Sequence, residues 1–134
     1  MENNVHFAYR ELKVYQYARE YAKYVYGIID QCFPEYEKYA LGDQLRRAAI
    51  SITSNLAEST GRYSTKEQIH FIEISFGSLY ETMSQLELSH DVGYITQVQL
   101  SEVEQQVSTI AKLMSGYRES KINLLRNSST ANNH

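Results

Sequence analysis

The sequence has few of the residues that interrupt helices or cross-link small folds. Its 134 residues include one proline, six glycines, one cysteine and no tryptophan. A single cysteine, Cys32, excludes an internal disulfide and suits a reducing compartment. A chain of this length can bury a sizeable core without a disulfide or a metal. We therefore expect one domain that is held together by apolar packing.

Long apolar runs and a secretory leader are also missing. No segment approaches the roughly 20 consecutive apolar residues that span a bilayer. The N-terminal MENNVHF has neither the basic start nor the apolar stretch of a signal peptide. These features predict a cytoplasmic protein with no membrane partner.

An excess of basic residues is absent as well. The chain carries 13 Lys and Arg against 16 Asp and Glu, a net charge of −3 at pH 7. A stand-alone nucleic-acid binder usually shows a basic balance or a basic face. Any contact with nucleic acid would therefore need a local patch, and basic residues increase only slightly toward the end of the chain.

What the sequence does contain is helical periodicity. In four segments, apolar residues recur every three or four positions, as in an amphipathic helix with one face in a core. The segments cover about residues 9–31, 41–59, 64–93 and 96–125. No segment alternates convincingly at the period of two that is typical of a strand.

Start and stop signals agree with these segments. Ser64 with Glu67, and Thr96 with Gln99, match the capping box at the start of a helix. Short loops join the last three segments, so consecutive helices should be antiparallel neighbours. The sequence predicts an all-α protein, an up-and-down antiparallel four-helix bundle over residues 1–126. The polar residues 127–134 are expected to form a disordered tail.

Signs of catalysis are weak. Di-iron bundles use Glu-x-x-His motifs on two different helices, whereas Glu67-x-x-His70 and Glu87-x-x-His90 fall on one segment. Twenty helical residues separate them by about 30 Å. No nucleophile with a base and no Gly-rich phosphate loop is present. We predict no catalytic residue, no metal and no cofactor.

The second segment carries a polar stripe beside its apolar one. Spacings of three and four place its members on one helix face. The stripe consists of Gln44, Arg47, Ser51, Asn55, Glu58 and Arg62. One interpretation is a hydrogen-bond network that sets the register between helices or subunits. The other is a contact surface on which Arg46, Arg47 and Arg62 bind phosphates.

The third segment has a second apolar side. A helix that is apolar on two sides is expected to be buried on both. The residues on this second side are Phe71, Ile74, Gly77, Ser78 and Glu81. In a four-helix protein this side predicts self-association, and these residues are the candidate subunit interface.

The second segment also carries a family resemblance. QLRRAAISITSNLAE, residues 44–58, resembles the signature of the bacterial four-helix-bundle family that is associated with 23S rRNA intervening sequences. Phe33-Pro34, GSLYE at residues 77–81 and Gly93-Tyr94 are similar too. The resemblance covers about residues 7–125. Thr53 and Ser59 depart from it, since the family commonly has Pro and Gly there.

The resemblance implies an up-and-down bundle that assembles into a ring-shaped homopentamer. A distant relative is an accessory protein of diversity-generating retroelements that binds nucleic acid and reverse transcriptase. The ribosomal-protein label often used for the family reflects the location of the gene in the rRNA insert. For members that resemble this chain the molecular function is essentially unassigned.

These observations predict a non-enzymatic, self-assembling bundle, with itself as partner and structured RNA as a further one. The candidate nucleic-acid contacts are Arg46, Arg47, Arg62, Lys112, Arg118 and Lys121. The alternative is a structural or protein-partner scaffold without a nucleic-acid role, and an enzyme is a third. The positions of the arginines discriminate between the nucleic-acid and the scaffold interpretations. Arginines that line a shared surface favour polyanions, and arginines paired with Glu58 and Glu81 favour the scaffold.

Overall fold

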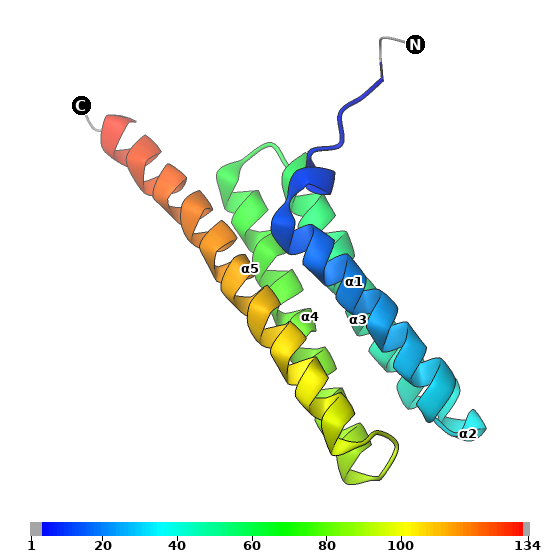
Figure 1. Cartoon of the computed structure of the whole chain (residues 1–134). Coiled ribbons are helices and arrows are strands. Elements are labelled where there is room, and N and C mark those ends of the chain that lie inside the picture. Colours follow the sequence, from blue (N-terminus) through cyan, green and yellow to red (C-terminus); the bar gives the residue numbers. More distant parts are fainter. Residues whose placement is uncertain (1–3, 133–134) are drawn as a thin grey trace.

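Four long helices form the molecule. The computed structural model describes the backbone of residues 4–132 and the side chains of residues 4–128. The elements are η1 (Ala8–Glu11), α1 (Lys13–Cys32), α2 (Glu35–Lys38), α3 (Leu41–Gly61), α4 (Thr65–Asp91) and α5 (Gln97–Asn132). The described residues contain no strand, and the predicted all-α four-helix bundle is confirmed (Figure 1).

The long helices follow one another up and down. α3 packs against α1 and α4, and α5 packs against α4 and α1. Around the bundle the order is therefore α1, α3, α4, α5, with α1 diagonal to α4 and α3 diagonal to α5. This order makes the α1–α3 side and the α4–α5 side opposite faces of the bundle.

The core is made by the apolar stripes that the periodicity predicts. Its largest fully buried side chains include Tyr21, Leu45, Ile52, Leu79 and Met114. The Tyr21 hydroxyl lies 2.9 Å from Thr82 Oγ1, which itself donates to the Leu79 carbonyl. Because the single Thr82 proton is used there, the Tyr21 hydroxyl is the donor. Burial raises the pKa of Tyr21 to about 12.

The predicted capping box at Thr96 is complete, whereas at Ser64 only the N-cap half of the predicted box is formed. Ser64 Oγ accepts from the Glu67 backbone N–H at 3.1 Å. The Thr96 N–H donates to Gln99 Oε1 at 2.8 Å, and the Gln99 N–H donates to Thr96 Oγ1 at 3.2 Å. Each box satisfies backbone donors that the first turn of a helix leaves unpaired. Gly93, with a φ of +88°, makes the turn between α4 and α5 in a conformation that favours glycine.

The helix boundaries differ from the prediction at both ends of the chain. At the start, η1 is separated from α1 by the extended Leu12, and α2 was not expected from the sequence. At the other end, residues 127–132 continue α5, whereas the sequence predicts a disordered tail. These six residues contain no Pro or Gly, so an established helix can propagate through them. Residues 133–134 of the predicted tail lie outside the described residues.

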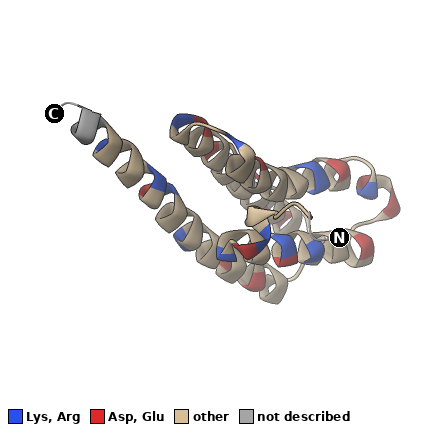
Figure 2. Cartoon of the chain, turned by 90° about the horizontal axis from the view of Figure 1, so that it is seen from above, with Lys and Arg blue, Asp and Glu red and all other residues tan. Residues whose placement is uncertain are grey.

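α5 is the longest of the helices, and the six additional residues lengthen it further. It has 36 residues, against 20 in α1 and 21 in α3. At 1.5 Å per residue it is about 20 Å longer than either. Its C-terminal end extends away from the rest of the bundle (Figures 1 and 2).

Candidate interaction surfaces

The middle of the predicted polar stripe links α3 to α4. Ser51 and Asn55 are half-buried, whereas the other four members are exposed. Asn55 Nδ2 donates to the Ser51 carbonyl at 2.8 Å and to Ser51 Oγ at 2.9 Å. Ser51 Oγ in turn lies 2.7 Å from Ser78 Oγ on α4. This part of the stripe is a small interhelix hydrogen-bond network.

The end of the stripe closes the α3–α4 turn. Arg62 Nη2 lies 3.1 Å from Glu58 Oε1, and the guanidinium stacks over the Phe71 ring at 4.5 Å from its centroid. Gln68 Nε2 donates to the Arg62 carbonyl at 3.0 Å. Arg62 is therefore engaged with an acid and an aromatic ring of its own chain.

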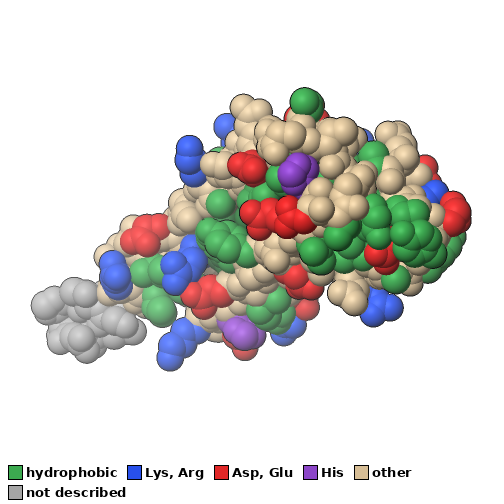
Figure 3. Space-filling view, turned by 90° about the horizontal axis from the view of Figure 1, so that it is seen from below, with side chains coloured by type: hydrophobic (Ala, Val, Ile, Leu, Met, Phe, Trp, Pro, Cys, Tyr) green, Lys and Arg blue, Asp and Glu red, His purple; other side chains and the backbone are tan. Residues whose placement is uncertain are grey.

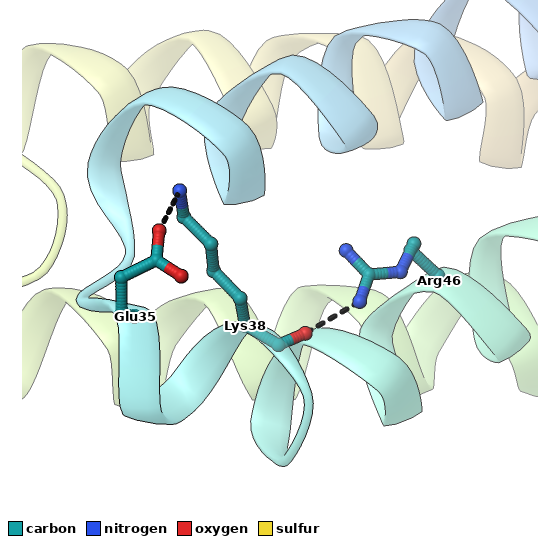
Figure 4. Close-up of polar contacts among 3 residues, drawn as sticks. All are labelled: Glu35, Lys38 and Arg46. Atoms are coloured by element: carbon teal, nitrogen blue, oxygen red, sulfur yellow. Dashed lines mark hydrogen bonds and ion pairs between the residues drawn. The ribbon is translucent and has the colours of Figure 1, made fainter.

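Arg46 is held at the start of α3. Its guanidinium donates to the Lys38 carbonyl and, at 2.7 Å, to Asp43 Oδ1. Lys38 pairs with Glu35 at 2.9 Å, and this hydrogen bond raises the pKa of Lys38. Figure 4 shows Glu35, Lys38 and Arg46 around the connection from α2 to α3. Arg46 thus ties two helices of one chain together.

Gly42, beside Arg46, is a structural requirement that the sequence pattern did not single out. A Cβ at this position would lie 3.0 Å from Ile29 Cγ2 and 3.1 Å from the Glu37 carbonyl oxygen. Those contacts are too close for most side chains, so glycine lets the start of α3 approach α1 and α2.

The cations of α5 are only partly available. Arg118 donates from Nε and Nη2 to Glu73 Oε2 of α4, at 3.1 and 2.8 Å. Lys121 Nζ lies 5.7 Å from the centroid of the Tyr117 ring. Arg47 on α3 and Lys112 on α5 are exposed and have no polar side-chain partner among the described residues.

The six candidate nucleic-acid contacts do not gather on one surface. They come from α3 and α5, which are diagonal in the bundle. Figure 2 shows basic and acidic residues interspersed along the helices rather than separated into two faces. The structure therefore does not unite these residues in one patch within a single chain.

The predicted subunit interface on α4 is partly used inside the chain. Ser78 is buried against Ser51, and Phe71 is half-buried beneath Arg62. Glu81 accepts from Gln85 Nε2 at 3.2 Å. Ile74 is 38% exposed, and Gly77 has open space where a side chain would be. The interface stays a prediction, with these last two residues as its accessible part.

Sequence reasoning missed two outer grooves. One lies between α1 and α3, has a volume of about 570 Å³, and is lined by Tyr15, Arg19, Ala22, Lys23, Tyr26 and Thr53. The other lies between α4 and α5, has a volume of about 450 Å³, and is lined by Tyr80, Met83, Glu87, Glu104, Val107, Ser108 and Ala111. The spacing of Tyr15, Ala22 and Tyr26, which share one face of α1, was the available signal.

Apolar surface also gathers at one end of the molecule. Figure 3 views the bundle from the end that carries α2, and hydrophobic side chains form continuous areas on it. Tyr36 and Tyr39 in and after α2 are each 76% exposed. Exposed apolar surface of this extent is a feature of interaction sites.

The described residues show no metal-binding cluster. Within residues 4–132, no three His, Cys, Asp or Glu side chains come together in a way that could hold an ion. In the same part of the chain, none of the helices has the length and apolarity that crossing a bilayer requires.

These features define the class of the molecule: an all-α four-helix bundle with polar links between its helices and apolar grooves on its outside. The model of the 23S rRNA-intervening sequence protein family matches residues 10–116, and the chain belongs to this family.

The fold has a solved counterpart. A crystal structure of a protein of unknown function from the S23 ribosomal protein family of Bacteroides thetaiotaomicron superimposes with a TM-score of 0.73. It is 24% identical to this chain, and the match covers 79% of this chain and 95% of the other. No curated protein matches the sequence.

Proposed function

We propose that the protein is a non-enzymatic scaffold that assembles with copies of itself and acts by binding partner molecules rather than by catalysis. One observation supports this proposal above the others. Three of the four arginines that could have formed a surface for polyanions are paired inside the chain, whereas apolar side chains stay exposed on the outer helix faces.

The paired arginines come from three places in the bundle. Arg46 is held by Asp43, Arg62 by Glu58, and Arg118 by Glu73. An arginine paired with a carboxylate keeps other N–H donors, but the carboxylate offsets its charge and weakens its attraction for a phosphate. Three of the six candidate contacts are thus less available to nucleic acid, and the scaffold interpretation gains.

The exposed apolar residues lie on several helices. Tyr26 on α1 is 42% exposed, Ile50 on α3 is 46% exposed, and Tyr80 and Leu88 on α4 are 61% and 52% exposed. Single apolar residues at the surface are ordinary, but residues that line grooves are typical of protein–protein contacts. A second copy would remove them from water.

Sedimentation equilibrium at micromolar concentration tests the proposal. We expect a mass several times that of the single 15.5 kDa chain. The homopentamer that the family resemblance implies would have five times the mass of the single chain. A single species at 15.5 kDa over the whole concentration range would overturn self-assembly.

Structured RNA is the second candidate partner, supported by the unpaired Arg47 and Lys112. Assembly would repeat these cations in every subunit and increase avidity without a new contact. Fluorescence anisotropy with a labelled RNA hairpin should then show binding that weakens steeply from about 50 to 200 mM salt. Arg47→Glu with Lys112→Glu should weaken it further. Absence of binding at the lowest salt would contradict an RNA role.

A further inference from the structure

We infer that copies of this chain join through two unlike faces, with the α1–α3 groove of one copy seated on the α4–α5 groove of the next. This inference rests on the proposed self-assembly and names the surfaces that perform it. The inferred contact differs from the interface predicted from the sequence. The predicted interface lies on α4 alone, whereas the inferred contact joins the α1–α3 side of one copy to the α4–α5 side of another.

The α1–α3 groove has an apolar floor and a basic rim. Tyr15, Ala22 and Tyr26 of α1 line it together with Thr53 of α3. On the rim, Arg19 has no side-chain partner among the described residues. Lys23 has a loose pair with Glu20 at 3.5 Å, in which both side chains are more than 70% exposed. A pair so exposed contributes little and is easily exchanged for another.

The α4–α5 groove has the opposite charge. Its floor is made by Met83 and Tyr80 of α4 and by Val107 and Ala111 of α5. Its rim carries Glu87 and Glu104, and neither carboxylate has a partner among the described residues. The nearest basic residue in sequence, Lys112, follows Ala111 but does not line the groove, and Arg118 farther along α5 is already paired with Glu73.

The two grooves match in three respects. They are similar in volume, about 570 and 450 Å³, both have mainly apolar floors, and each rim offers two like charges that complement the other. Complementary rims favour the correct partner and disfavour like-with-like pairing. Tyrosine and arginine, both present here, are enriched at protein–protein contacts.

A third groove lacks this complementarity. It lies between α1 and α5, and Glu20 is its one charged lining residue among Gln16, Tyr17, Gln105, Gln106, Thr109 and Ile110. An uncharged partner could fit there, but no described face of the chain shows a matching rim. The observations therefore favour the α1–α3 and α4–α5 pair.

The placement of the faces determines the kind of assembly. Because the α1–α3 and α4–α5 sides are opposite in the helix order, one copy can bind two others at once. Contacts between unlike faces pass from copy to copy in one direction, and they give a ring if the rotation closes. They do not give the closed dimer that a self-complementary face produces.

Charge reversal with rescue tests the pairing. Arg19→Glu with Lys23→Glu reverses one rim, and Glu87→Lys with Glu104→Lys reverses the other. Each double variant should weaken assembly at least tenfold in sedimentation equilibrium. The quadruple variant, in which both rims are reversed, should recover assembly, because the faces are again complementary. An equal mixture of the two double variants should also associate, because each variant complements the other, although a ring of five copies then contains one contact between like variants.

A matched control separates these faces from net charge. Lys13→Glu with Lys66→Glu makes the same change in net charge as Arg19→Glu with Lys23→Glu, at exposed residues that line neither groove, and it should assemble like wild type. Circular dichroism checks that every variant is folded. If a reversal impairs folding, the milder Arg19→Gln with Lys23→Gln should weaken assembly in the same direction.

The outcomes distinguish this inference from the proposed function. A monomeric wild type would overturn self-assembly and the inference with it. A wild-type oligomer that both reversals leave intact, or that the control also dissociates, would overturn only the inference. The inference would also be overturned if the Arg19→Glu, Lys23→Glu variant assembled like wild type but no longer bound an RNA hairpin. That result would make the α1–α3 groove a nucleic-acid surface.

Discussion

Two seams of the same bundle, between α3 and α4 and between α1 and α5, are built in different ways. The α3–α4 seam contains small polar side chains. Ser75 is fully buried and donates to the Ile52 carbonyl at 2.7 Å, and Ser51 and Ser78 meet at 2.7 Å. Small side chains at a contact let two helices approach closely. Here the hydroxyl of one helix reaches the backbone of the other.

The α1–α5 seam is wider and its polar links lie at its edges. The Tyr24 hydroxyl donates to Glu102 Oε2 at 2.6 Å, and Gln99 Nε2 lies 3.3 Å from Cys32 Sγ. Partial burial and then the Glu102 carboxylate raise the pKa of Tyr24. A groove of about 510 Å³ remains between the helices. Side-chain size at the contact thus decides which sides of the bundle stay open.

The largest expected effect comes from filling the close seam. Ser75→Leu adds volume at a fully buried position and removes the hydrogen bond to Ile52. We expect the free energy of unfolding to fall by about 3 kcal/mol, since overpacking and a lost buried hydrogen bond act together. Urea denaturation followed by circular dichroism measures the change.

Gln105→Leu is the matched substitution in the wide seam. Gln105 is exposed and lines the α1–α5 groove, so its effect should stay within about 0.5 kcal/mol. Equal losses in the two variants would show that the seams do not differ in packing as the structure indicates.

A smaller effect is expected from the hydrogen bond between Ser51 and Ser78. A double-mutant cycle with Ser51→Ala and Ser78→Ala isolates the interaction from the other consequences of each change. We expect a coupling of about 1 kcal/mol in the free energy of unfolding, because both hydroxyls are at least half-buried. A coupling within experimental error of zero would mean that water replaces the bond at no cost.

The smallest effect should come from the polar link of the wide seam. The corresponding cycle uses Tyr24→Phe and Glu102→Ala. Because Glu102 is exposed, water competes for the bond and the coupling should be about 0.5 kcal/mol or less. Added salt should reduce it further, since one partner is a solvated charge. A coupling larger than that of Ser51 with Ser78 would reverse the comparison between the seams.

Much of the fold could be predicted from local sequence features. The apolar stripes predicted which residues form the core, and the boxes at Ser64 and Thr96 predicted where α4 and α5 begin. The continuation of α5 through residues 127–132 was missed, because their composition was considered without the helix that precedes them. The short α2 was missed, since four residues carry too little periodicity to detect.

The interaction surfaces were less predictable. Spacing placed Ser51 and Asn55 on one face of α3, but the bond to Ser78 depends on the register between α3 and α4. In the same way, nothing in the sequence indicates that Arg118 pairs with Glu73, 45 residues away.

The sequence by itself thus determined the four long helices, the starts of α4 and α5, the core residues and the family, because these depend on neighbours a few positions apart along the chain. The tertiary structure alone decided which arginines are paired and which sides of the bundle carry grooves. It also placed the basic rim of Arg19 and Lys23 opposite the acidic rim of Glu87 and Glu104. The physical reason is that helices distant in sequence become neighbours only after packing, and the size of the residues between them sets how closely they meet.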